Sequence, residues 1–385
     1  MVDHAYAGKI EEAIKEALRI FERDQEDPHF LVLGATGVGK SSLINRVFRA
    51  ELHAVSDIKS TTRKFSTQKF AASGNNPILI TDSPGYGEVG HDKEYSRMIV
   101  DESRKCHAII LVLKADEKGY QRDLDILTEV FASPEFDHEK PLLIALNQID
   151  KLPPVREWQP PYVLDGPENS DQGEKAKNIK AKLQLVREQF RSLGGRLAPL
   201  ADPVMCEPRE GTPSGIETFR EHLFDALPKA AKLKYARAAR IAENASSELI
   251  AKLDRMADGI IATNATVAAA VVLANPLPVS DWIVLAPIQI GLIIEIGAIY
   301  GKTIDWATSR ETLAALGAGF AARTLFQGLI SLLPGIKNII GPPYAAAATY
   351  GMGVAAKRYF KTGKAPSAEQ IRKTVEEELS RQKAN

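Results

Sequence analysis

The chain has 385 residues, 44% of them hydrophobic, which is enough for two domains that each bury a core. Its 49 Lys and Arg residues equal its 49 Asp and Glu residues, so bulk charge indicates no DNA partner and argues against RNA. The two cysteines, Cys106 and Cys206, fit a reduced compartment, and the N-terminus lacks a signal-peptide pattern, so we expect a cytoplasmic protein.

Apolar residues recur with helical spacing near the N-terminus, between residues 8 and 24. Ile10, Ile14, Leu18 and Phe21 fall on one face and charged residues on the other, which predicts an amphipathic helix. This helix either caps the following domain or pairs with helices from the far C-terminus. The pattern leaves both interpretations open.

Residues 34–41 have the pattern G-x-x-x-x-G-K-S between an apolar run at 29–33 and a helix-forming segment at 42–48. A strand, a glycine-rich loop and a helix in this order predict a phosphate-binding loop. Glycines let backbone N–H groups surround an anion, and the helix N-terminus favours negative charge. Lys40 can reach the β- and γ-phosphates, and the Ser41 hydroxyl can bind Mg²⁺. The predicted phosphate-binding residues are Gly34, Ala35, Thr36, Gly37, Val38, Gly39, Lys40, Ser41 and Ser42.

Two strands are predicted next, at 64–70 and 78–81, and the second ends in Asp82-Ser83-Pro84-Gly85. A lone D-x-P-G predicts only a turn. About forty residues after a phosphate loop, it predicts a second segment that contacts the phosphates. We expect Asp82 to hold Mg²⁺ through water and the Gly85 N–H to sense the γ-phosphate.

Further along, apolar strands at 108–113 and 141–146 flank a helix near 121–132, and the second strand ends in Asn147-Gln148-Ile149-Asp150. In a phosphate-loop protein this N-x-x-D pattern predicts guanine recognition. A carboxylate at Asp150 can accept hydrogen bonds from both N1–H and the exocyclic amine of guanine, and adenine offers no such pair. The sequence therefore predicts GTP and GDP, rather than ATP, as ligands. Three further elements are expected: a charged helix at 174–192, a last strand with its exit loop at 203–207, and a closing helix from Gly215 to Pro228.

These motifs make residues 27–228 resemble the translation-factor-type (TRAFAC) GTPases, and within them the Era/TrmE-like group. The resemblance implies an α/β domain with a mostly parallel sheet and helices on both faces. It makes Thr62 the expected Mg²⁺-ligating threonine of the first switch, with Thr61 as the alternative. The implied catalytic residues are Lys40, Thr62 and Gly85, and the implied Mg²⁺ ligands are Ser41, Thr62 and Asp82.

The sequence departs from the family pattern at four places. Gly37 stands where potassium-activated relatives carry asparagine, and Gln148 replaces the usual lysine of the guanine motif. Tyr86 occupies the place of the water-orienting glutamine of Ras-like proteins, so we expect slow intrinsic hydrolysis that a partner, a dimer or Glu88 assists. Cys206-Glu207 replaces a Ser-Ala pair, and this pair is our candidate for the last guanine-binding loop.

The C-terminal half is predicted to be helical. A long charged helix is expected over 229–258, followed by apolar stretches around 259–280, 282–294 and 325–336, and by a final amphipathic helix at 367–382. Asn275-Pro276-Leu277-Pro278 with Asp281, Gln289 with Tyr300-Gly301, and Pro334-Gly335 resemble the YcjF-type helical domain of unknown function. The order of helix, G domain and helical domain is also loosely similar to the immunity-related GTPases.

Two interpretations of the apolar stretches stay open. They form either the core of a helical bundle with a soluble exterior, or a hairpin that inserts in or lies on a membrane. Most runs are too short for a hydrocarbon core of about 30 Å, and Glu295 interrupts one of them. The basic cluster at 357–364 would suit anionic headgroups.

The sequence thus predicts three parts: an N-terminal helix at 1–26, a GTP-binding domain at 27–228 and a helical domain at 229–385. The leading hypothesis is a Mg²⁺-dependent GTPase switch, cytoplasmic or at the inner face of the membrane, whose helical domain couples nucleotide state to membrane association or self-assembly. The alternative is an interaction protein that nucleotide merely stabilises. An Era-like role in ribosome assembly is less favoured, because no KH-type G-x-x-G module follows the G domain.

Overall fold

The computed structural model divides into two compact units. The sheet unit comprises residues 26–238 and 242–246, and the helical unit comprises residues 1–25, 239–241 and 247–385. The structure describes residues 12, 15–21, 25–49, 53–59, 65–71, 77–85, 92–155, 171–193, 199–208, 213–241, 247–274, 277–278, 285–302, 339–364 and 366–384.

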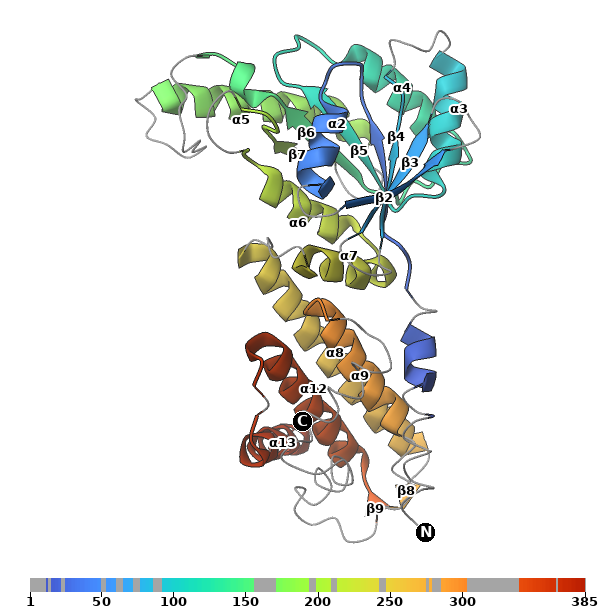
Figure 1. Ribbon diagram of the computed structural model, residues 1–385, viewed down its shortest axis with the longest axis vertical. Helices are drawn as coiled ribbons and strands as arrows, with labels where there is room; N and C mark the ends of the chain where they lie inside the picture. The colour runs from blue at the N-terminus through green and yellow to red at the C-terminus, as the bar shows by residue number, and fades with distance from the viewer. Residues whose placement is uncertain are drawn as a thin grey trace. The chain divides into compact units, whose positions relative to one another are not determined.

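A seven-stranded sheet forms the centre of the first unit, in the order β2-β3-β4-β1-β5-β6-β7 (Figure 1). Neighbouring strands from β4 to β7 pair in parallel, whereas β3 pairs antiparallel with both β2 and β4. The predicted mostly parallel α/β fold is therefore confirmed. The strands are β1 (His29–Leu33), β2 (His53–Lys59), β3 (Ser66–Ala71), β4 (Ile78–Asp82), β5 (Ala108–Lys114), β6 (Leu142–Asn147) and β7 (Leu200–Pro203).

Helices cover both faces of this sheet, which is why its central strands are continuous apolar runs. Leu31 and Leu33 belong to one buried cluster with α3 (Asp92–Ser103), α4 (Gln121–Ala132) and α5 (Asp171–Phe190). On the opposite face, the ring of Phe30 lies 5.8 Å from that of Phe48 and 6.1 Å from that of Tyr235. Phe48 lies in η1 (Asn45–Arg49), which continues α2 (Lys40–Ile44). Tyr235 lies in α7 (Lys229–Ile241), which follows α6 (Ile216–Ala226).

The helix behind the glycine-rich loop ends in a turn of π-helix, η1, that the sequence pattern did not predict. Arg220 of α6 explains how this end is stabilised. Its guanidinium donates to the carbonyl oxygens of Val47 at 3.1 Å and Arg46 at 2.8 Å, and it pairs with Glu217 at 2.7 Å. The last helical carbonyls are thus satisfied by a side chain that lies far away in the sequence.

The last strand begins earlier than the sequence predicts. It spans Leu200–Pro203, whereas the strand and its exit loop are expected at 203–207, because only Leu200–Pro203 pair with β6. Residues 204–206 resemble a strand in sequence because they are fully buried in the loop that follows. Within the helix expected over 229–258, the structure describes α7 and α8 (Ser247–Ala274), and residues 242–246 lie outside the described residues.

Buried hydrogen bonds hold β4 immediately before Asp82. Thr81 is fully buried, and its hydroxyl lies 2.8 Å from both His29 Nε2 on β1 and Thr67 Oγ1 on β3. Burial lowers the pKa of His29 to about 4, so the ring is neutral at physiological pH and can accept from Thr81. These links fix the three neighbouring strands in a common register next to the candidate site.

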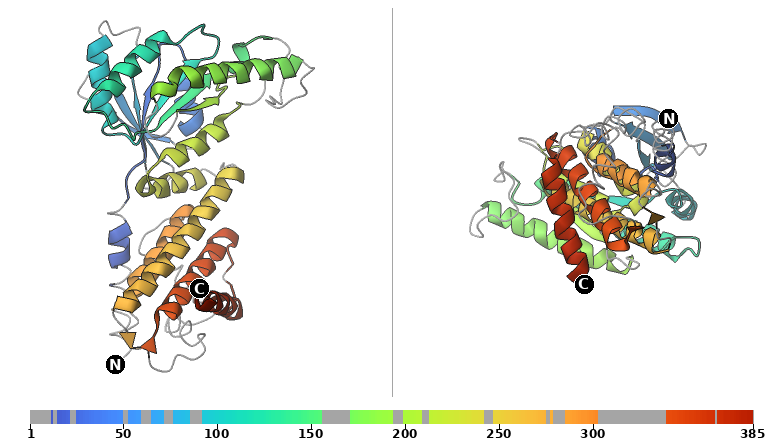
Figure 2. Two further views of the ribbon diagram at one scale, coloured as in Figure 1. Left: turned by 180° about the vertical axis from the view of Figure 1, so that it is seen from behind. Right: turned by 90° about the horizontal axis from the view of Figure 1, so that it is seen from below.

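The helical unit is built around α12 (Pro342–Thr362), which packs against α8, α9 (Ala286–Ile299) and α13 (Ala368–Ala384). Figure 2 shows these helices from behind and from below. A short pairing of β8 (Leu277–Pro278) with β9 (Ile339–Ile340) adds a small ribbon. Described residues 15–21 are helical and are grouped with this unit, which supports the proposal that the N-terminal helix pairs with C-terminal helices.

One described helix, α8, is long and apolar enough to cross a membrane by length and composition alone, a test that the core helix of a soluble protein also passes. Part of the basic cluster at 357–364 is engaged inside the unit. Lys357 pairs with Asp258 at 2.6 Å and Lys361 with Asp254 at 2.5 Å. The Tyr300 hydroxyl donates to Asp254 at 2.5 Å. The predicted features at 275–276, 281 and 325–336 lie outside the described residues.

Gly353 offers a test of the packing between α8, α9 and α12. A Cβ at this position would lie 2.7 Å from Ile261 Cγ1 and 3.1 Å from Leu292 Cδ2, so Gly353→Ala must push the helices apart. We expect a loss of about 1–3 kcal/mol in the free energy of unfolding of this unit, measured by denaturant titration. Gly259→Ala is the matched control, because no atom lies within 4 Å and alanine favours a helix interior. Equal stability of the two variants would contradict this packing.

Candidate functional site

The glycine-rich loop between β1 and α2 has a backbone that only glycine accommodates. Gly34, Gly37 and Gly39 have φ values of 150°, 83° and 97°. A Cβ at Gly34 would lie 2.5 Å from the carbonyl oxygen of Val112, and one at Gly39 would lie 2.2 Å from Asn147 Nδ2. The loop is therefore shaped by its neighbours on β5 and β6 as well as by its own sequence.

Lys40 begins α2 and curls back over the loop. Its Nζ donates to the carbonyl oxygens of Gly34 at 2.9 Å and Ala35 at 3.2 Å. The ammonium group is therefore held directly above the loop backbone. Ser41 follows in the first turn of the helix with an exposed side chain, so its hydroxyl is accessible to a ligand.

Asp82 ends β4 next to this loop, since β4 and β1 pair in parallel with Asp82 opposite Val32. Burial raises the pKa of the Asp82 carboxyl group, and the nearby Lys40 opposes that shift. Among the described residues, its buried Oδ1 has no hydrogen-bond partner. A buried carboxylate oxygen without a donor is an acceptor that a hydrated cation would satisfy, so Asp82 fits the expected Mg²⁺ site.

Gly85 brings the segment after β4 into direct contact with the glycine-rich loop. A Cβ at Gly85 would lie 2.0 Å from Thr36 Oγ1 and 2.7 Å from the backbone nitrogen of Thr36. No larger residue fits without displacing one of the two segments. The Gly85 N–H is thus placed beside the loop predicted to hold phosphates.

Asn147 joins three loops at the end of β6. Its side chain is 2% exposed, and its Nδ2 donates to the carbonyl oxygen of Val38 at 3.0 Å. Its Oδ1 accepts from the backbone N–H of Cys206 at 3.4 Å. Gln148 has a left-handed backbone with φ of 61°, and its Nε2 donates to the carbonyl oxygens of Gly37 at 3.3 Å and Val38 at 3.4 Å. The two amides therefore fix the glycine-rich loop from the side opposite Asp82.

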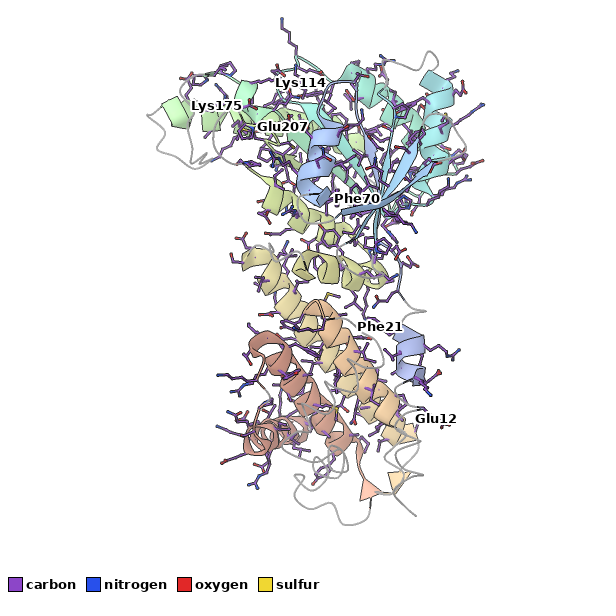
Figure 3. The ribbon with its side chains drawn as sticks, in the orientation of Figure 1. Glu12, Phe21, Phe70, Lys114, Lys175 and Glu207 are labelled. Atoms are coloured by element: carbon purple, nitrogen blue, oxygen red, sulfur yellow. The ribbon has the colours of Figure 1, made fainter. Side chains whose placement is uncertain are left out.

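The remaining predicted base-binding residues lie on two adjacent turns. Asp150 belongs to the short helix η2 (Ile149–Lys151), and its side chain is partly exposed. Cys206 is buried, and burial raises the pKa of its thiol to about 12, which leaves it neutral. The carbonyl oxygen of Cys206 accepts from Arg46 Nε at 2.9 Å, whereas the Glu207 side chain is exposed (Figure 3).

The structure thus brings together the loops after β1, β4, β6 and β7, because all four strands are parallel and end at one edge of the sheet. Thr61, Thr62, Tyr86 and Glu88 lie outside the described residues. The sequence analysis missed three side chains that support the site from behind. Arg46 and Lys175 bind backbone carbonyls of the loops after β7 and β6, and Arg220 binds carbonyls at the end of the helix behind the glycine-rich loop. A lone basic residue gives no sequence signal for such a contact.

Comparison with known proteins agrees with this geometry. Residues 29–148 match the family described as 50S ribosome-binding GTPase, and residues 236–384 match DUF697, a domain of unknown function. The uncharacterized protein YfjP of Escherichia coli K12 is 28% identical over 209 residues, which are 53% of this chain and 64% of YfjP. The tRNA modification GTPase MnmE of Lactococcus lactis IL1403 is 32% identical over 123 residues, 31% of this chain and 25% of MnmE.

Two further matches cover the same region. GTPase Der of Nitrosococcus oceani is 28% identical over 156 residues, which are 38% of this chain and 32% of Der. A crystal structure of Aquifex aeolicus Era bound to GDP and AlF4⁻ aligns with 17% identity and a TM-score of 0.36, over 58% of this chain and 69% of that chain. The chain spans less than two thirds of the length of the curated relatives named above.

Gly85→Ala tests whether nucleotide hydrolysis depends on the contact between the segment after β4 and the glycine-rich loop. The added Cβ overlaps Thr36, so the Gly85 N–H must move away from the glycine-rich loop. If that N–H stabilises charge on the γ-phosphate, we expect nucleotide hydrolysis to slow by about 10²-fold or more, measured by phosphate release. Gly119→Ala, with no atom within 4 Å of the new Cβ, should hydrolyse at the wild-type rate. An unaffected Gly85→Ala variant would remove this segment from the mechanism.

Proposed function

Because the chain belongs to the TRAFAC-class P-loop GTPases and carries a DUF697 domain behind its GTPase domain, we propose that it is a Mg²⁺-dependent GTP switch. It binds GTP in preference to ATP, hydrolyses it slowly to GDP and phosphate, and passes the state of the site to the helical domain. Its proposed location is the cytoplasm, including the inner face of the membrane.

The observation that carries this proposal is that two segments contact the same glycine-rich loop. One is the segment from Asp82 to Gly85, predicted to sense the γ-phosphate, and the other is the guanine motif that begins at Asn147. Gly85 lies against Thr36, and the Asn147 amide bonds to Val38, so both segments contact the same short backbone. A phosphate held by this loop would be within reach of both. Any rearrangement at one segment would alter the support of the other.

The chain's own groups account for binding and for charge stabilisation. Lys40 would exchange its two carbonyl acceptors for phosphate oxygens, since the ammonium already lies over the loop. Ser41 and Asp82, with Thr62 as the third candidate, would hold Mg²⁺, which neutralises charge on the phosphates. Gly85 would donate its N–H to the γ-phosphate while water attacks in line. Asp150 would accept from the guanine edge.

The enzymatic part of the proposal is tested by steady-state phosphate release with GTP, ATP and Mg²⁺. Lys40→Ala and Asp82→Asn should each lower turnover by about 10²-fold or more, because Lys40 would stabilise charge on the phosphates and Asp82 would hold the Mg²⁺ ion that does the same. Lys93→Ala, an exposed lysine of α3, is the control and should keep the wild-type rate. Turnover that survives in Lys40→Ala, or that requires ATP, would contradict a GTPase at this site.

The proposed output is membrane association or self-assembly of the helical domain. The second half of α8 carries no charged residue after Asp258, and Val267 and Leu273 are 43% and 72% exposed. These features support contact with an apolar surface. The pairing of Lys357 and Lys361 with aspartates leaves fewer cations for anionic headgroups.

Co-sedimentation with anionic vesicles tests this output for wild type and Lys40→Ala, with GTP, GDP or no nucleotide. We expect wild type to pellet with vesicles more in one nucleotide state than in the other, and Lys40→Ala to show no such difference. A protein that stays in solution in every state would exclude membrane coupling. Light scattering of the same samples without lipid then reports self-assembly.

A second candidate is an interaction protein whose fold nucleotide stabilises without turnover. It is favoured by Tyr86, which stands where Ras-like GTPases orient the attacking water with glutamine. A GTP-dependent rise in melting temperature with no phosphate release, with or without vesicles, would select this candidate.

A further inference from the structure

A buried lysine lies directly behind the predicted guanine-reading carboxylate. The Lys175 side chain, in the first turns of α5, is fully buried. Its Nζ donates to the carbonyl oxygens of Asp150 at 2.6 Å and Pro154 at 3.2 Å, and also to that of Leu152. One turn later, Asn178 Nδ2 donates to the carbonyl oxygen of Pro153 at 3.0 Å. Figure 3 shows Lys175 on α5, the helix behind this turn.

The chemistry of these contacts makes them specific. A buried ammonium group is costly unless acceptors replace the lost water, and an ammonium group has three N–H donors. The turn at 150–154 supplies three carbonyl acceptors that converge on a single point. These bonds stabilise the conformation of the turn in which the three carbonyls converge on the ammonium group. Lys175 therefore supports the path of the backbone that carries Asp150.

In the described structure, the neighbouring side chains of the motif do not hold the Asp150 carbonyl. Gln148, at the position of the usual lysine, uses its amide on the glycine-rich loop, and Asn147 is committed to Val38 and Cys206. The backbone closes the turn through the N–H of Lys151, which donates to the Gln148 carbonyl at 3.0 Å. The α5 side chains add hydrogen bonds to further carbonyls of this turn.

We propose that Lys175 is the positioning residue for guanine selection: by holding the Asp150 carbonyl, it orients the Asp150 carboxylate toward N1–H and the exocyclic amine of the base. The proposal rests on the proposed function, because it assumes that guanine nucleotides occupy this site. It assigns Lys175 to recognition of the base and not of the phosphates, which the glycine-rich loop would bind.

The test compares the affinities of GDP and IDP. The hypoxanthine base of IDP lacks the exocyclic amine from which the Asp150 carboxylate would accept a hydrogen bond. Dissociation constants are measured by titration calorimetry in the presence of Mg²⁺. Wild type should prefer GDP, and Lys175→Met should reduce that preference by about tenfold, because GDP loses two hydrogen bonds to Asp150 whereas IDP, which keeps N1–H, loses one. Lys177→Met, an exposed lysine on the same helix, is the matched control and should keep the wild-type preference.

A double-mutant cycle separates positioning from general support of the fold. In an Asp150→Asn background, where the carboxylate is gone, Lys175→Met should cause no further change in the GDP-to-IDP ratio. Equal weakening of GDP and IDP by Lys175→Met would mean a merely structural role and would overturn the proposal. If Lys175→Met does not fold, Asn178→Ala decides: a preference unchanged from wild type overturns it.

The outcomes also separate this inference from the proposed function. If wild type binds neither GDP nor IDP, the proposed GTPase function fails, and the role of Lys175 in base selection fails with it. If wild type prefers GDP and the preference survives in a folded Lys175→Met variant, the inference alone is wrong.

Discussion

The buried amide of Asn147 is the contact on which the geometry of the site depends. It holds the glycine-rich loop through Val38 and the loop after β7 through Cys206, and Gly39 leaves the space that it occupies. A side chain that donates to one loop and accepts from another sets their separation, and its burial makes a lost bond costly. The phosphate side and the base side of the site are therefore one connected structure rather than two neighbouring motifs.

Near the Asn147 contacts, the site places a carboxyl group and an ammonium group where Mg²⁺ and phosphate could bind. Asp82 is a carboxyl group whose pKa burial raises, next to the ammonium of Lys40, which rests on loop carbonyls. A Mg²⁺ ion with phosphates would give each group a stronger partner, which is why ligand binding is expected to order the segment from Asp82 to Gly85.

The helical unit is held together mainly by close packing between helices. Small residues on α12 let three other helices approach closely, as the space around Gly351 and Gly353 shows. Its polar contacts gather where Asp254 meets Tyr300 and Lys361. A bundle held by close packing and a few ion pairs can change partners when an apolar surface becomes available, which is consistent with a role in association.

The motifs and the family resemblance that they carry were enough to predict the mostly parallel fold. The loop from Gly34 to Ser41, Asp82 and the segment from Asn147 to Asp150 do meet at one edge of the sheet. These predictions work because a phosphate loop depends on backbone conformations that local sequence specifies. The same local patterns did not indicate α3, β2 or the π-helical turn η1. They also placed the last strand too late, because burial in a loop and burial in a strand look alike in sequence.

What only the tertiary structure decided is which distant side chains hold these segments in place. Arg220 lies far along the chain from the helix end that it stabilises, and Lys175 is separated from Asp150 by a long insertion. A lysine or arginine in a helix has the same appearance in sequence whether it faces water or a buried carbonyl. Sequence spacing therefore identified the groups that would touch a ligand, whereas folding alone determined the groups that position them, since those contacts depend on chain packing rather than on neighbouring residues.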